Sequence, residues 1–143
     1  MKDWVPEIEK QSQADIVALQ EKKLQEVLAY VNEHSAFYKR LFKEHNINVS
    51  AIKTLSDLTK LPTTCKDDLQ RKNDAFRCVP KSAIVDYAST SGTLGTPVTF
   101  GLTDNDLNRL AYNEAISLAC AGIKKGDVVQ LMTTIDRRFM RSE

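Results

Sequence analysis

The chain has 143 residues, a length typical of one ordinary domain, with 42% hydrophobic and 27% charged residues. Its formal net charge of +1 gives no reason to expect a nucleic-acid partner, and no apolar run approaches the roughly 20 residues of a membrane-spanning helix. The first six residues lack the apolar segment of a signal peptide. Cys65, Cys78 and Cys120 lie far apart, without zinc or redox spacing. These features predict a globular, cytoplasmic protein with reduced thiols and no metal site of its own.

Helical patterns fill the first half of the chain. Apolar residues recur at helical spacing from about Asp15 to Asn32, which predicts an amphipathic helix. Ser35 is suited to cap a second, shorter helix ending near Asn46. The apolar side of that helix would contain Phe37, Tyr38, Leu41 and Phe42.

Two shorter helical segments are expected next. Ser56 is predicted to cap a single turn over residues 57–60, which stops before Pro62. Thr64 followed by Asp67 has the spacing of a helix start, and predicts a short helix running toward Lys72.

The periodicity changes after residue 80. Residues 83–88 and 97–102 are rich in β-branched and aromatic side chains and predict two strands. Thr103 is expected to cap a helix that ends at Gly122. A turn at Gly126 then leads to a third predicted strand over residues 128–132. The buried stripe of the helix is expected to comprise Leu107, Leu110, Ala111, Ala115, Leu118 and Ala119.

The order of these elements predicts the α/β class. Residues 1–80 are expected to be mostly helical, and residues 81–143 to form a strand–loop–strand–helix–strand unit. The chain reaches Glu143 directly after the last predicted strand and its charged neighbours. We therefore expect an incomplete domain over residues 1–143.

The loop between the first two predicted strands is unusually rich in hydroxyl groups. Residues 87–97 read YASTSGTLGTP, which places two of the chain's five glycines just before a proline. Gly92 and Gly95 can adopt backbone angles that let successive N–H groups point into one concavity and bind an anion. Hydroxyl groups that could donate to phosphate oxygens belong to Ser89, Thr90, Ser91, Thr93 and Thr96.

A hairpin turn with surface hydroxyls is the simplest alternative, because short G-x-x-G patterns often occur by chance. The ordinary P-loop is a poor match, since it requires Gly-Lys-Ser/Thr followed by a helix, whereas Thr96 and Pro97 follow Gly95 here. A KH domain is also disfavoured, because its G-x-x-G lies between helices of a basic RNA-binding module.

The segment from Thr90 to Thr99, TSGTLGTPVT, resembles the phosphate-binding signature Ser-Gly-Thr-Thr-Gly-Lys-Pro of the adenylate-forming enzymes, the acyl-CoA synthetases and their relatives. The segments HSAFYKRLF, LTKLPTTCKDDL, TDNDL and GIKKGDVVQLMTT occur around it in the order expected of phenylacetate-CoA ligases. The resemblance extends from about Trp4 to Thr134. It implies a helical segment followed by part of the adenylate-forming enzyme N-terminal domain.

The resemblance implies ATP-dependent activation of a carboxylic acid, by way of an acyl-adenylate, to a CoA thioester. ATP, Mg²⁺ and coenzyme A would be the cofactors, an aromatic acid such as phenylacetate the substrate, and a homodimer the assembly. The phosphate-binding residues would be Ser91, Gly92, Thr93 and Gly95, with Thr90 and Thr96 as secondary donors. No catalytic residue is assigned in this chain.

Two residues depart from the family signature. Leu94 replaces a threonine and removes one hydroxyl donor, and Thr96 replaces a lysine and removes a positive charge. In the family, the adenine-binding, ribose-binding and Mg²⁺-binding segments and the C-terminal lysine lie beyond the part that these 143 residues resemble, and none of them is found here. We therefore expect the 143-residue chain to be inactive alone. The alternatives are a non-catalytic fragment or module that binds phosphate or a partner, and a relative that adenylates a different acid.

Overall fold

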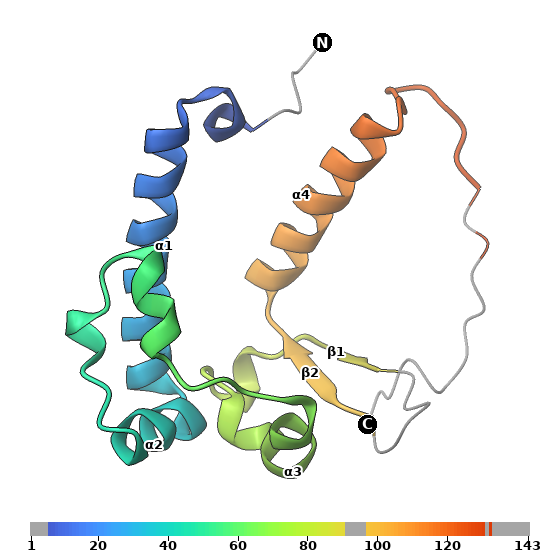
Figure 1. Cartoon of the computed structure of the whole chain (residues 1–143). Helices are drawn as coiled ribbons and strands as arrows, with labels where there is room; N and C mark the ends of the chain where they lie inside the picture. The colour runs from blue at the N-terminus through green and yellow to red at the C-terminus, as the bar shows by residue number, and fades with distance from the viewer. Residues whose placement is uncertain (1–5, 91–96, 131, 133–143) are drawn as a thin grey trace. The chain divides into compact units, whose positions relative to one another are not determined.

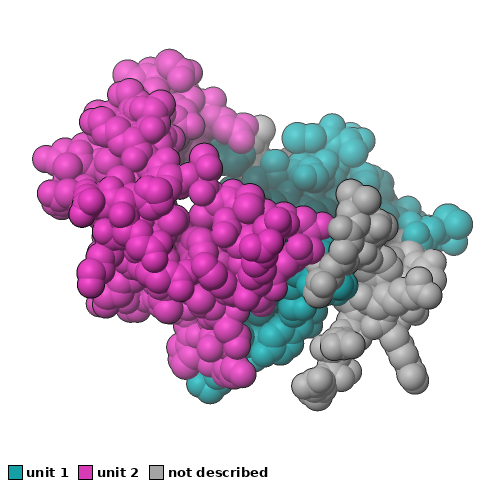
Figure 2. Space-filling model, turned by 60° about the horizontal axis from the view of Figure 1, so that its bottom comes forward, with its two compact units in different colours: residues 1–7, 82–143 teal, residues 8–81 magenta. Residues whose placement is uncertain are grey.

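The computed structural model describes residues 6–90, 97–130 and 132. The chain divides into two compact units, which Figure 2 colours separately. The helical unit is Ile8–Lys81, and the hairpin unit comprises Met1–Glu7 together with Ser82–Glu143. The elements of both units can be followed by their labels and colours in Figure 1.

The helical unit contains α1 (Gln13–His34), α2 (Ala36–Glu44) and α3 (Lys66–Phe76). The predicted helix over residues 15–32 is confirmed and slightly longer than expected, because the Ser12 side chain accepts the Asp15 N–H and caps α1. Among the described residues, the short 3-10 helices are η1 (Glu7–Lys10), η2 (Val49–Ala51), η3 (Leu55–Lys60) and η4 (Lys81–Ala83).

Ser35 joins three helices of this unit. It ends α1 and caps α2 as predicted, because its Oγ accepts the Tyr38 N–H at 3.3 Å. The same hydroxyl donates to the Ala75 carbonyl in α3 at 3.0 Å, and Ser35 is 1% exposed. One buried hydroxyl therefore provides a partner for groups on two helices, as buried polar groups require.

The core of the helical unit forms around Leu28, Phe42 and Ile52, which come from α1, α2 and the segment after η2. Six partly buried side chains pack against these three: Leu24, Val31, Tyr38, Ile47, Val49 and Leu61. Phe37 of α2 stacks on Phe76 of α3 with ring centroids 3.8 Å apart. The apolar side predicted for α2 thus contacts both neighbouring helices.

Two predicted helix starts are wrong by one or two residues. The N-cap of η3 is Thr54, with Asp57 as its reciprocal partner, in place of Ser56. The N-cap of α3 is Cys65, whose N–H and thiol both donate to the Asp68 carboxylate, in place of Thr64. In each case the helix starts where an aspartate three residues later can reach back to the capping N–H.

The sheet of the hairpin unit is antiparallel, with β1 (Asp86–Ser89) beside β2 (Thr99–Leu102). The first strand begins later than the predicted residue 83, because η4 occupies that position. Pairing begins at Asp86 opposite Leu102, the last residue before the chain turns into the next helix.

Helix α4 (Asp104–Cys120) follows β2 and is capped by Thr103 as predicted. Gly122, with φ of 85°, follows its end, and the Ile123 N–H returns to the Leu118 carbonyl at 3.1 Å. This is the left-handed termination that glycine adopts without steric cost. The turn at Gly126, with φ of 103°, is likewise confirmed.

Two expectations for the hairpin unit are wrong. No residue of α4 is buried, and Leu110 and Leu118 of its predicted buried stripe are 41% and 42% exposed. Residues 128–130 form no strand, and Val128 is 98% exposed. Helical spacing places apolar residues on one face of α4, but burial of that face needs a second element packed against it. A strand forms only where a neighbouring strand provides hydrogen-bond partners.

None of the helices among the described residues combines the length and the apolar composition needed to cross a membrane.

Candidate functional site

The predicted phosphate-binding loop is described at its two ends. Thr90 follows β1 directly, and Pro97 and Val98 lead into β2. The other predicted site residues, Ser91, Gly92, Thr93, Gly95 and Thr96, lie outside the described residues. The structure therefore describes the base of the loop, where the chain leaves β1 and enters β2.

Two hydrogen bonds between Thr90 and Val98 close the base of the loop. The Thr90 N–H donates to the Val98 carbonyl at 3.0 Å, and the Val98 N–H donates to Thr90 Oγ1 at 3.1 Å. Val98 is 2% exposed and Thr90 is half-buried. These bonds continue the β1–β2 ladder one residue beyond the Ser89–Thr99 pair.

The sequence predicts the Thr90 hydroxyl as a secondary donor to phosphate. Its oxygen already accepts the Val98 N–H. An alcohol that accepts one hydrogen bond still carries its own O–H as a donor. Thr90 is therefore part of the hydrogen-bonded base of the loop. Its O–H group remains a possible donor, on an oxygen that the bond to Val98 holds in place.

Hydrogen bonds also hold the end of β2, where the chain continues into α4. The Asp106 carboxylate accepts the Thr103 N–H at 3.0 Å and the Thr103 hydroxyl at 2.8 Å, and Thr103 Oγ1 accepts the Asp106 N–H. Hydrogen bonds from the Thr103 N–H and hydroxyl lower the pKa of Asp106. The strand that follows the loop is thus joined to α4 by a complete capping box.

No family model matches the sequence. Among curated proteins, the chain is 38% identical over 125 residues to the phenylacetate-coenzyme A ligase of Thermus thermophilus, covering 86% of this chain and 28% of that protein. It is 35% identical over 126 residues to the phenylacetate-coenzyme A ligase of Escherichia coli, covering 87% of this chain and 29% of that protein.

A solved structure agrees with these sequence matches. It is that of 2-hydroxyisobutyryl-CoA ligase in complex with 2-HIB-AMP and CoA, and this chain is similar to it with a TM-score of 0.75 at 32% identity. The match covers 82% of this chain and 26% of the other. This chain is related to the N-terminal portion of the phenylacetate-CoA ligases.

The relationship accounts for the order of elements in the structure. A mostly helical part followed by a small antiparallel sheet matches the N-terminal part of adenylate-forming ligases. The expected fold class is confirmed at this level. The chain spans less than a third of the length of the phenylacetate-CoA ligases that it matches.

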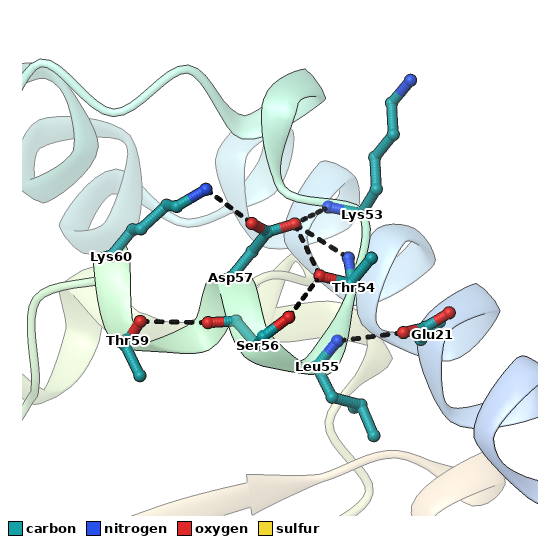
Figure 3. Close-up of polar contacts among 8 residues, drawn as sticks. All are labelled: Glu21, Lys53, Thr54, Leu55, Ser56, Asp57, Thr59 and Lys60. Atoms are coloured by element: carbon teal, nitrogen blue, oxygen red, sulfur yellow. Dashed lines mark hydrogen bonds and ion pairs between the residues drawn. The ribbon is translucent and has the colours of Figure 1, made fainter.

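A second polar cluster of this chain lies around Asp57, and the sequence predicts only the short helix that contains it. Figure 3 shows the Asp57 carboxylate at its centre. It accepts the Lys53 and Thr54 N–H groups at 2.9 Å each, the Thr54 hydroxyl at 3.0 Å and the Lys60 ammonium at 2.6 Å. The Leu55 N–H donates to Glu21 of α1 at 3.2 Å, so this start of η3 is joined to α1.

The cluster around Asp57 is a structural junction. The Lys60 ammonium, followed by the Lys53 and Thr54 N–H groups, holds the pKa of Asp57 well below its usual range. Its carboxylate therefore stays ionised with its lone pairs occupied by this chain's own donors. The signal that could have identified it is Thr54 three residues before Asp57, a capping-box spacing.

Asp57→Asn should destabilise the helical unit near neutral pH, because an amide cannot accept all four hydrogen bonds of the carboxylate. Asp57 has a folded-state pKa below its unfolded value, so the stabilisation is present above the unfolded pKa and is lost as the pH falls through the folded one. Urea unfolding should show wild type and variant converging as the pH drops below about 4. Asp67→Asn, at a carboxylate 70% exposed, is the matched control. A gap between wild type and D57N that stayed constant with pH would contradict this account.

Over the described ranges, no group of three His, Cys, Asp or Glu side chains could hold a metal ion. Mg²⁺ bound with a nucleotide takes many of its ligands from phosphate oxygens and water. We assign no step of the reaction to a metal held by this part of the chain.

Proposed function

We propose that this chain supplies the phosphate-binding part of an ATP-dependent carboxylate–CoA ligase. A carboxylate oxygen would bond to the α-phosphorus of ATP while the bond to pyrophosphate breaks. The thiol sulfur of CoA would then bond to the acyl carbon, releasing AMP and the thiol proton. The observation that supports this most directly is the 38% identity over 86% of the chain to a phenylacetate-CoA ligase.

The hydroxyl-rich loop is the part of this chain that we assign to ATP. Ser91, Gly92, Thr93 and Gly95 would hold the β- and γ-phosphates, with Thr90 and Thr96 as secondary donors. Donors placed in advance stabilise the charge that develops on the departing pyrophosphate. The hydrogen-bonded base at Thr90 and Val98 supports this assignment, because it fixes where the loop begins and ends.

We propose an aromatic acid such as phenylacetate as the substrate, on the strength of the names of the curated relatives. Because the structural relative is a 2-hydroxyisobutyryl-CoA ligase, a small hydroxy acid is the alternative substrate to compare with phenylacetate. Both acids would be activated through the same adenylate chemistry. The comparison of the two acids therefore tests specificity separately from mechanism.

A second candidate function is non-catalytic binding of phosphate or a partner. The hydrogen-bonded base of the hydroxyl-rich loop at Thr90 and Val98 is compatible with it as well. The two candidates differ in turnover. We expect the 143-residue chain alone to catalyse no exchange of pyrophosphate into ATP.

The experiment is pyrophosphate exchange into ATP with phenylacetate, 2-hydroxyisobutyrate or no acid. It uses the chain alone, and also a chimera in which the chain replaces the matching segment of the Thermus thermophilus ligase. We expect acid-dependent exchange by the chimera, lost in Ser91→Ala and Gly92→Ala and retained in the control Ser117→Ala on α4. A folded chimera without exchange would contradict the ligase proposal. Unchanged exchange in both loop variants would contradict the loop assignment.

A further inference from the structure

The last rung of the β1–β2 ladder is built differently from an ordinary rung. In an antiparallel sheet, a hydrogen-bonded pair exchanges two backbone N–H···O=C bonds. At Thr90 and Val98 the first of these is present, from the Thr90 N–H to the Val98 carbonyl at 3.0 Å. The second bond runs from the Val98 N–H to the Thr90 side-chain oxygen at 3.1 Å. The hydroxyl takes the place that the Thr90 carbonyl would hold.

Because a side-chain oxygen accepts the Val98 N–H, this hydrogen bond depends on the residue type at position 90. Val98 is 2% exposed, so water is poorly placed to satisfy its N–H if the hydroxyl is removed. A buried donor left without an acceptor costs the desolvation of that group. Serine places an oxygen at the same position as threonine, whereas valine has the same shape and no acceptor. The pair Thr90→Ser and Thr90→Val therefore separates hydrogen bonding from packing.

The location of the rung gives it a consequence beyond stability. Thr90 and Val98 are the residues at which the chain leaves the sheet and returns to it. The side-chain bond replaces one backbone bond and so releases the Thr90 carbonyl from the ladder. The base of the loop is therefore closed in part by a threonine side chain.

We propose that Thr90 is a positioning residue for the phosphate-binding loop, acting through Oγ1 on the Val98 N–H. This inference rests on the function proposed above, and it adds to the secondary-donor role of Thr90 a role in fixing the ends of the loop. Removal of the bond would loosen the base at Thr90 and Val98 that holds the two ends of the loop. Because the loop donors act on charge that develops as pyrophosphate departs, the loss falls more on kcat than on the KM for ATP.

The first measurement does not depend on ATP. Amide hydrogen exchange at Val98, followed by NMR in the full chain, should be on the order of tenfold faster in Thr90→Val than in wild type. Thr90→Ser should restore protection at Val98. Thr99→Val is the matched control, since Thr99 is the exposed neighbour in β2. Equal Val98 exchange in wild type and Thr90→Val would overturn the hydrogen-bond assignment.

The second measurement uses pyrophosphate exchange by the chimera. We expect Thr90→Val to lower kcat at least tenfold with a smaller change in the KM for ATP, and Thr90→Ser to restore kcat. Fast Val98 exchange with unchanged kcat would overturn the positioning role and leave the proposed function intact. A wild-type chimera that folds and gives no exchange would overturn the proposed function, while the Val98 result would still decide whether the side-chain bond exists.

Discussion

Phe42→Ala should lower the free energy of unfolding of the helical unit by about 3–5 kcal/mol, the usual loss for a phenylalanine truncated in a core. Phe42 is 4% exposed and lies in one cluster with Leu28 and Ile52. The truncation would leave a cavity between residues of α1, α2 and the segment after η2. These elements cannot collapse independently, because Ser35 joins α1 to α2 and anchors both to α3.

The measurement is urea unfolding of the full chain followed by far-ultraviolet circular dichroism. Since a loss of this size can exceed the stability of a small unit, Phe42→Leu provides a milder variant, with an expected loss of roughly 1 kcal/mol. Val27→Ala, at a position on α1 that is 50% exposed, is the control and should change little. Equal midpoints for Phe42→Ala and Val27→Ala would show that the cluster is not the core of this unit.

The helices of this protein could be predicted because their signals are local. Ser35 and Thr103 are capping residues next to amphipathic segments, and both cap the helices expected of them. The start of α3 lies one residue later than predicted, because the Asp68 carboxylate accepts the Cys65 N–H. The spacing of Thr64 and Asp67 that led to the prediction is the same as that of Cys65 and Asp68.

Burial in the hairpin unit could not be predicted from periodicity. The apolar residues of α4 have helical spacing, yet Leu107 is 37% exposed and Leu110 is 41% exposed. A pattern identifies which face is apolar, whereas burial depends on another layer. The same reason applies to residues 128–130, whose composition suits a strand but which have no ladder partner among the described residues.

The sequence predicts which residues form the candidate loop, but not the hydrogen bonds that close its base. Hydroxyl-rich residues between two strands identified the loop, and the base at Thr90 and Val98 lies where that prediction placed it. The side-chain bond that closes this base could not be derived, because it requires the register that pairs Ser89 with Thr99. Local sequence therefore indicates what a loop contains, and strand pairing decides how it is held.

Gly101→Ala should destabilise the β1–β2 hairpin by about 1–3 kcal/mol through overpacking. Gly101 pairs with Tyr87 in the sheet. A Cβ at position 101 would lie 2.6 Å from Ile84 Cδ1, 3.1 Å from Cγ1 and 3.2 Å from Cγ2. All three contacts are closer than atoms normally approach and belong to one side chain, so Ile84 would have to move. Amide exchange of β1 and β2 residues measures the loss.

A double-mutant cycle isolates this contact, because Ile84→Ala removes all three overlapping atoms. In that background Gly101→Ala should be neutral or stabilising, since alanine in a strand is favoured over glycine by roughly 0.5–1 kcal/mol. The effect of one substitution thus changes sign with the residue at position 84, a coupling expected only of residues in direct contact. An equal cost of Gly101→Ala in both backgrounds would mean that another neighbour requires the glycine. A cost only in the presence of Ile84 would show that close packing of this isoleucine against β2 excludes a side chain at position 101.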